Sequence, residues 1–216
     1  MEEKEGIFNV FIDTSKSMDY GEYKKSVRAQ QLAGALAYII LNNLDRVYVT
    51  QVREGQLTVG KGVTGRTSYR KVMQDIQSME FNGNTRLNDA IKSRNITQRG
   101  VSIIISDFLD PVGVEDAIKY LLYKKQEIVL IQVLAREEVD VTLEGTVNLT
   151  DIETGEEMKI TVTKSVIDRY MTELQGLKNN LEKMAKKYHM TYMSTVSDES
   201  FDKVLFEGFK NTGFIM

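Results

Sequence analysis

The stretch "DTSKS" carries the most chemistry in this sequence, because it places an aspartate and two serines at alternate positions, Asp13, Ser15 and Ser17. Small oxygen-bearing side chains are the ligands that hard cations prefer, and Mg²⁺ takes them in octahedral geometry while keeping some of its waters. The simpler alternative is a capped loop, since Asp and Ser also cap helices. One cap needs only one such side chain, and the helical pattern begins several residues later. We therefore interpret the stretch as part of a metal site.

Two further loops carry ligands of the same kind. Thr85 lies in "GNTR" before a short helical segment, and Asp107 lies in "SDFLD" after the apolar run "VSIII". In an open parallel sheet the carboxyl ends of the strands meet at one edge, where ligands bind. The predicted metal site consists of Asp13, Ser15, Ser17, Thr85 and Asp107.

The expected cation is Mg²⁺, with Mn²⁺ or Ca²⁺ as alternatives. Two aspartates roughly neutralise a dication, and neutral hydroxyls leave it able to accept one more anionic ligand. We therefore expect a partner protein to donate a carboxylate, next to an apolar rim formed by Met18 and Phe108. Without a cation the two aspartates should repel each other, so Asp107→Asn should leave the metal-free fold unharmed or more stable.

The elements that would position these loops alternate between strand and helix. Near-continuous apolar runs at Ile7–Ile12 and Val101–Ile105 indicate strands buried on both faces of a parallel sheet. Helices are predicted at about 23–42, 67–79, from 87, 114–123 and from about 167 to 188. The predicted fold is a doubly wound, Rossmann-like α/β domain with helices on both faces of a mostly parallel sheet. It has an antiparallel edge strand after the turn Glu54-Gly55, and an extra hairpin near 146–162 that turns at Thr154-Gly155.

Composition excludes several classes of function. The chain has 216 residues, a net charge of −3 and no basic stripe, so nucleic acid is not an expected partner. Cysteine is absent, and the single histidine, His189, ends a helical pattern and is interpreted as a surface residue. No apolar run reaches the ~18–20 residues of a membrane span, so we expect no membrane insertion of this segment and a cytoplasmic location.

Enzymatic alternatives find partial support. "GKGVTG" matches a dinucleotide-binding pattern, but the strand before it is a short polar edge strand. An aspartyl-phosphate phosphatase would need a second aspartate where Ser15 stands. A Mg²⁺-dependent phosphatase-like or nucleotide-binding enzyme is therefore the competing hypothesis, and a non-enzymatic binding module is preferred.

The motifs resemble a known family. "DTSKS" is similar to the D-x-S-x-S of the von Willebrand factor A fold, whose metal-ion-dependent adhesion site also uses a loop threonine and a later aspartate, here Thr85 and Asp107. "DTSKSM", "NTRLNDAI", "IIISDFLD" and "LTDIETGEE" in this order resemble the bacterial branch called domain of unknown function fifty-eight. Asn84 departs from the glycine that is usual in that family, which concerns the loop's shape rather than a ligand.

The resemblance implies one von Willebrand factor A-like domain over residues 1–216. It implies a protein-binding module that works with a MoxR-type AAA+ ATPase in the assembly or maturation of other proteins. It also implies that Ser15 and Ser17 bind the cation directly, with Asp13 and Asp107 acting partly through waters. Related proteins usually carry membrane helices, so the alternative to a cytoplasmic protein is a soluble domain cut from a membrane-anchored chain. The acidic "DIETGEE" turn is a candidate docking segment.

Overall fold

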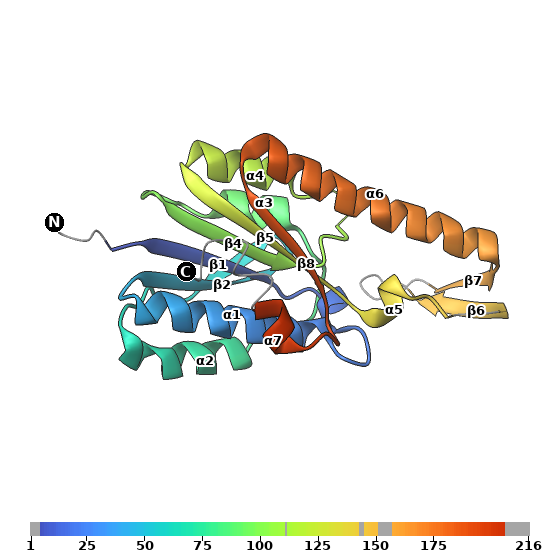
Figure 1. The fold of residues 1–216 in the computed structure, drawn as a ribbon, viewed down its shortest axis with the longest axis horizontal. Helices are drawn as coiled ribbons and strands as arrows, with labels where there is room; N and C mark the ends of the chain where they lie inside the picture. The colour runs from blue at the N-terminus through green and yellow to red at the C-terminus, as the bar shows by residue number, and fades with distance from the viewer. Residues whose placement is uncertain (1–4, 111, 143–144, 151–156, 206–216) are drawn as a thin grey trace.

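A six-stranded sheet forms the centre of the protein, in a computed structural model that describes residues 5–110, 112–142, 145–150 and 157–205. Its strand order is β3-β2-β1-β4-β5-β8 (Figure 1). The strands are β1 (Ile7–Asp13), β2 (Arg46–Arg53), β3 (Gln56–Val59), β4 (Gly100–Ser106), β5 (Gln126–Leu134) and β8 (Thr191–Val196). All neighbours pair in parallel except β2 and β3, so the predicted mostly parallel sheet is confirmed.

The antiparallel edge strand follows from a tight turn. Glu54 and Gly55 both have positive φ, 51° and 76°, as a two-residue hairpin turn with the twist of its strands requires. Strand β3 is largely exposed, whereas β1 and β4 are buried over most of their length. The apolar runs therefore mark the centre of the sheet and the polar run marks its edge, as predicted.

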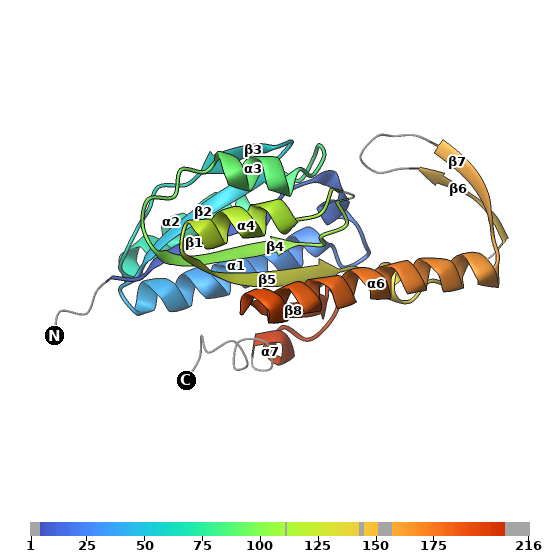
Figure 2. The same ribbon diagram turned by 90° about the horizontal axis from the view of Figure 1, so that it is seen from above.

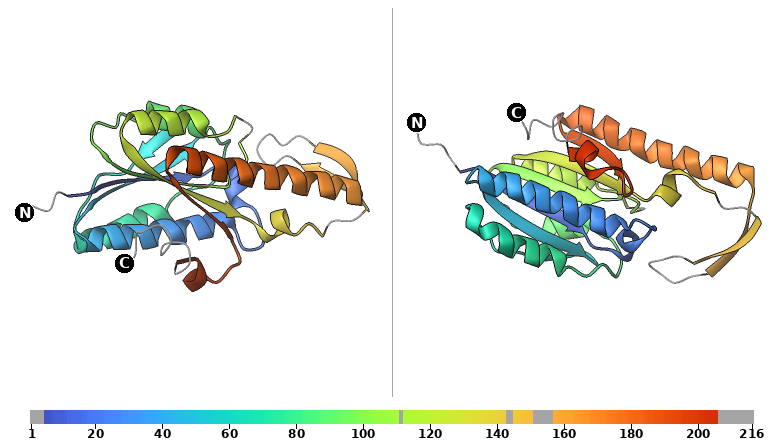
Figure 3. Two further views of the ribbon diagram at one scale, coloured as in Figure 1. Left: turned by 45° about the horizontal axis from the view of Figure 1, so that its top comes forward. Right: turned by 60° about the horizontal axis from the view of Figure 1, so that its bottom comes forward.

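Helices cover both faces of the sheet. On one face α1 (Lys25–Asn42) and α2 (Tyr69–Gln77) pack over Val10 and Ile12 of β1. On the other face α3 (Leu87–Ser93), α4 (Glu115–Tyr123) and the C-terminal part of α6 (Lys164–Tyr188) pack over Phe11 and Ile104 (Figure 3). Alternate residues of β1 thus enter opposite cores, which is the layering of a doubly wound fold.

Four of the described helical elements are short and lie between or after the longer strands and helices. They are the 3-10 helices η1 (Lys16–Asp19) and η2 (Arg66–Ser68), and the short helices α5 (Arg136–Val139) and α7 (Phe201–Lys203). Helix α1 begins at Lys25, two residues later than predicted. His189 ends α6 in a left-handed conformation with φ 53°, so the interpretation of a histidine at a helix end is confirmed.

A hairpin arm projects from this body. It consists of β6 (Gly145–Thr150), β7 (Glu157–Val162) and the N-terminal half of α6, and it extends well beyond the sheet (Figure 2). Strands β6 and β7 pair with each other in a separate antiparallel sheet, so the predicted extra hairpin is confirmed. The predicted turn Thr154-Gly155 and most of "DIETGEE" lie outside the described residues. None of the described helices is long and apolar enough to cross a membrane.

Candidate metal centre

Asp13 stands at the centre of the predicted site, as the last residue of β1 and fully buried. Its Oδ1 accepts a hydrogen bond from the Ser15 backbone N–H at 3.0 Å. Its Oδ2 accepts from Thr85 Oγ1 at 3.0 Å and from Ser106 Oγ at 2.7 Å. The structure therefore brings Asp13, Ser15 and Thr85 together at the carboxyl edge of the sheet.

Backbone hydrogen bonds hold the loop of Thr85 against the "DTSKS" loop. Lys16 N–H donates to Gly83 O and Asn82 N–H donates to Thr14 O, each at 2.9 Å. Gly83 itself has φ 71°, a conformation that favours glycine. The backbone N–H of Glu54 donates a hydrogen bond to the backbone carbonyl oxygen of Asn84 at 2.9 Å. This crossing of two loops is what places the Thr85 hydroxyl beside Asp13.

The two serines present a pair of hydroxyls. Ser15 Oγ lies 3.0 Å from Ser17 Oγ. Two neighbouring ligands of an octahedral Mg²⁺ lie about 2.9 Å apart, because each Mg–O bond is about 2.0–2.1 Å long. The spacing of the hydroxyl pair therefore fits one edge of such an octahedron.

Asp107 is also buried, one residue beyond the end of β4. Its Oδ1 accepts from the Leu109 backbone N–H at 3.1 Å, and its Oδ2 accepts from Lys25 Nζ at 2.7 Å. Lys25 Nζ also donates to Glu138 Oε1 of α5 at 2.6 Å. An internal ammonium thus lies at the site, bonded to one of the predicted metal ligands.

Sequence reasoning missed Lys25, Glu138 and Ser106. For Lys25 a signal existed, because it shares the buried face of α1 with Ala29, Leu32 and Leu36 at helical spacing. A charged residue on such a face requires a buried partner. Neither Ser106, at the end of an apolar strand, nor Glu138, in an acidic turn, had a comparable signal.

Burial and like charge shape the ionisation of the site. Burial, reinforced by the negative charge of Asp107, raises the pKa of Asp13 to about 6, and hydrogen bonds from Ser106 and Ser15 offset only part of this. Burial also raises the pKa of Glu138, which Lys25 partly counteracts. For Lys25 burial acts to lower the pKa, but Asp107 and Glu138 outweigh it and the net direction is upward. The site is a set of carboxylates that a positive charge stabilises.

The predicted donor set suits a hard cation better than zinc or iron. Nowhere in the described ranges do three His, Cys, Asp or Glu side chains gather in a group that could hold a metal ion. The predicted ligands are instead two carboxylates and three hydroxyls, which suit Mg²⁺ or Mn²⁺ more than soft metals. The residues fit the predicted cation, and their role as its ligands stays a prediction.

The prediction that Met18 and Phe108 form an apolar rim around the site is wrong. Met18 is 0% exposed and packs in the core under α1, because the 3-10 turn η1 directs it inward. Phe108 is 3% exposed and lies in the core on the opposite face, with φ 57°. Exposed apolar side chains close to the predicted ligands include Leu109, two residues after Asp107, and Tyr20, whose ring centroid lies 5.9 Å from Lys25 Nζ.

Comparison with known protein families identifies the family of this chain. The family described as "Protein of unknown function DUF58" matches residues 1–180. The chain belongs to the DUF58 family. No curated protein sequence is significantly similar to it.

Solved structures share the fold of this DUF58 chain. The conserved hypothetical protein BatB from Bacteroides thetaiotaomicron superposes with a TM-score of 0.59 at 16% identity, over 96% of this chain and 98% of that one. An aerotolerance-related membrane protein from Bacteroides fragilis gives 0.58 at 13% identity, over 95% and 97%. The SpRpn10 VWA domain gives 0.53 at 12% identity, over 95% of each chain. The predicted von Willebrand factor A fold is therefore confirmed.

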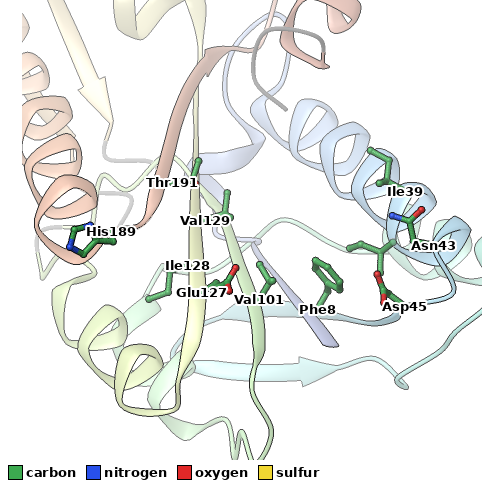
Figure 4. Close-up of a pocket in the computed structure, with 11 residues that line it drawn as sticks. Phe8, Ile39, Asn43, Asp45, Val101, Glu127, Ile128, Val129, His189 and Thr191 are labelled. Atoms are coloured by element: carbon green, nitrogen blue, oxygen red, sulfur yellow. The ribbon is translucent and has the colours of Figure 1, made fainter. Parts of the chain in front are cut away.

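A hollow of about 380 Å³ in this DUF58 domain lies at the other end of the sheet. It is bounded by the amino ends of β1, β4, β5 and β8 and by the end of α1, with Phe8, Val101, Val129, His189 and Asn43 among its lining residues (Figure 4). The Asp13 loop lies at the carboxyl ends of the same strands. The hollow is therefore separate from the candidate metal centre.

Proposed function

We propose that this domain is a protein-binding module whose partner is held through a divalent cation. The cation is bound by Asp13, Ser15, Ser17, Thr85 and Asp107, and it accepts a carboxylate from the partner protein. The observation that carries the proposal is the convergence of oxygen side chains from separate loops around Asp13, with Thr85 at 3.0 Å and the hydroxyl pair Ser15–Ser17 at 3.0 Å. A capped loop alone would not gather them.

Each residue has a distinct part in this proposal. Ser15 and Ser17 offer neutral oxygens directly, while Asp13 and Asp107 supply the negative charge. Ser106 donates to Asp13 Oδ2 and orients that carboxylate, because its own Oγ is fixed by accepting from the Phe108 backbone N–H at 2.9 Å. When bound, the cation supplies an electrophilic coordination position for an anionic ligand.

A binding role is preferred over hydrolysis. Both oxygens of Asp13 accept hydrogen bonds from protein donors, which favours an orienting carboxylate over a free nucleophile. Lys25 is held by two carboxylates, so it is not placed as a free general acid. These contacts support a module without chemistry of its own.

The first partner to test is a MoxR-type AAA+ ATPase, as the family resemblance implies. The role would be in the assembly or maturation of other proteins, either in the cytoplasm or as the soluble domain of a membrane-anchored chain. One structural neighbour is described as a membrane protein, which supports the second location.

A pull-down tests the proposal. The immobilised ATPase is presented with the 216-residue chain in Mg²⁺ and in EDTA, and with the variant Ser15→Ala/Ser17→Ala. We expect capture in Mg²⁺ only, and its loss in the double variant. The matched control is Ser78→Ala/Ser93→Ala, which removes two exposed serines that bond to carbonyls of their own helical segments. Equal capture in EDTA and by the Ser15/Ser17 variant would show that the domain binds through another face.

A further inference from the structure

Lys25 is a fully buried lysine beside the predicted metal ligands. Its side chain is 0% exposed, and Nζ lies 2.7 Å from Asp107 Oδ2 and 2.6 Å from Glu138 Oε1. Its neighbour Lys24 is half exposed and pairs with the exposed Asp19. The chain therefore places one lysine in solvent and the next one inside the site.

The fold holds Lys25 there from both sides. Lys25 opens α1, and its backbone N–H donates to Tyr20 O at 3.1 Å. Glu138 is fixed in turn, because its Oε2 accepts from the Ala135 backbone N–H at 2.8 Å. The adjacent Glu137 accepts from the Glu22 backbone N–H at 2.8 Å. The ammonium is thus pinned between the start of α1 and α5, with little freedom to move away from Asp107.

We propose that Lys25 is a built-in competitor of the divalent cation, which holds Asp107 in the metal-free protein and weakens metal binding. This inference rests on the proposed function. An ammonium bonded to one of two ligand carboxylates reduces the negative charge available to the metal and repels the incoming dication. The consequence is a site that binds its cation weakly on its own, so that the partner's carboxylate is needed to complete a stable shell. Metal and partner then bind cooperatively.

The competing view is that Lys25 is purely structural. A structural lysine would support the site, so removing it would lower both the stability of the fold and the affinity for metal. A competitor gives the opposite sign for the second quantity. The dissociation constant for Mn²⁺ therefore separates the two roles, and stability alone does not.

The test is Mn²⁺ binding to the full chain, followed by the paramagnetic resonance signal of free Mn²⁺ at low ionic strength. We expect Lys25→Met to bind Mn²⁺ about tenfold more tightly or better, because nearby unit charges in a protein interact by at least that much. The matched control is Lys24→Met, which removes an exposed lysine one position away and should change the dissociation constant by less than about twofold.

A second variant guards against loss of folding. Lys25→Met leaves the buried Asp107 and the partly buried Glu138 without their ammonium partner, which is destabilising. Lys25→Met/Glu138→Gln removes one charge of each sign and so keeps the net charge of the chain. It leaves the negative charge of Asp107 without the Lys25 ammonium. It too should bind Mn²⁺ more tightly than the wild type, whereas Glu138→Gln alone should bind it more weakly.

The outcomes are distinguishable. If the wild type binds Mn²⁺ and both Lys25 variants bind it equally or more weakly, the role of Lys25 is overturned while the proposed function stands. If Lys24→Met tightens binding as much as Lys25→Met, the effect is one of general charge and the inference also fails. If no variant binds Mn²⁺ at millimolar concentration, the proposed function itself fails. Binding only by the Lys25 variants would support the inference, and the pull-down in Mg²⁺ and in EDTA would then test whether the partner's carboxylate restores metal binding to the wild type.

Discussion

Lys25 Nζ donates a 2.7 Å hydrogen bond to Asp107 Oδ2, and the two side chains are 0% and 1% exposed to solvent. The residues are 82 positions apart in sequence. Their ion pair means that the metal-free site already holds one positive charge. From repulsion between Asp107 and Asp13 alone, Asp107→Asn should leave the metal-free fold unharmed or more stable. The ion pair with Lys25 reverses that expectation, because the substitution also removes an attraction.

We now predict that Asp107→Asn destabilises the metal-free protein by about 2–3 kcal/mol, because it removes one partner of a buried ammonium while Glu138 remains. Urea unfolding in EDTA measures the change. Asp19→Asn, which removes the exposed partner of Lys24, is the control and should alter stability by less than about 1 kcal/mol. Equal, small effects of the two substitutions would contradict the buried ion pair.

Saturating Mn²⁺ or Mg²⁺ should stabilise the native fold. Binding to the native state alone adds about 2.7 kcal/mol at a hundredfold excess over the dissociation constant, which raises the melting temperature of a chain of this size by roughly 5–10 °C. Thermal melts with metal and with EDTA measure this shift. Asp13→Ala should abolish it, and a shift of the same size in that variant would place the metal elsewhere.

The metal-free protein should lose stability as the pH rises from about 4 to about 6. The pKa of Asp13 is raised by burial and by Asp107 from 3.8 to about 6, so in this window the folded state binds more protons than the unfolded state, and the free energy of unfolding falls. The loss from this group is on the order of 2–3 kcal/mol. Asp13→Asn should lack this term, so the difference between the pH profiles of wild type and variant isolates it.

The same pKa predicts how metal binding depends on pH. A carboxylate must be ionised to serve the cation, so stabilisation by Mn²⁺ should be small at pH 5 and grow toward pH 7. Melts with and without Mn²⁺ at each pH measure it. A stabilisation that is constant across this range would mean that Asp13 is already ionised at pH 5 in the folded protein.

Met18→Ala should destabilise the fold by about 2–5 kcal/mol, the usual cost of truncating a fully buried methionine. Leu109→Ala, at an exposed position close to the site, should cost less than about 1 kcal/mol. Urea unfolding compares the two. If Met18→Ala left stability unchanged, Met18 would belong to the surface after all.

The sequence alone determined the order of strands and helices and the edge hairpin. The signals are local. Apolar runs such as Ile7–Ile12 and the helical spacing of apolar residues indicate whether a segment is buried on one face or on two, and the turn Glu54-Gly55 indicates where the chain reverses. The loops after buried strands could be assigned to one edge of the sheet by topology. Asp13, Thr85 and Asp107 were chosen on that basis, and the structure places all three at that edge.

Only the tertiary structure decided what surrounds them. The bonds of Lys25 to Asp107 and Glu138 span 82 and 113 positions and depend on how α1 lies against the ends of β4 and β5, which no local pattern encodes. The same holds for Met18 and Phe108, which lie in the cores on opposite faces of the sheet. Met18 reaches its core from the 3-10 helix η1, and Phe108 reaches the other from a left-handed backbone conformation. Periodicity tells which face of an element is buried, but the partner of a buried charge is chosen by packing between elements, because electrostatic and hydrogen-bond energies depend on distances that only the assembled fold sets.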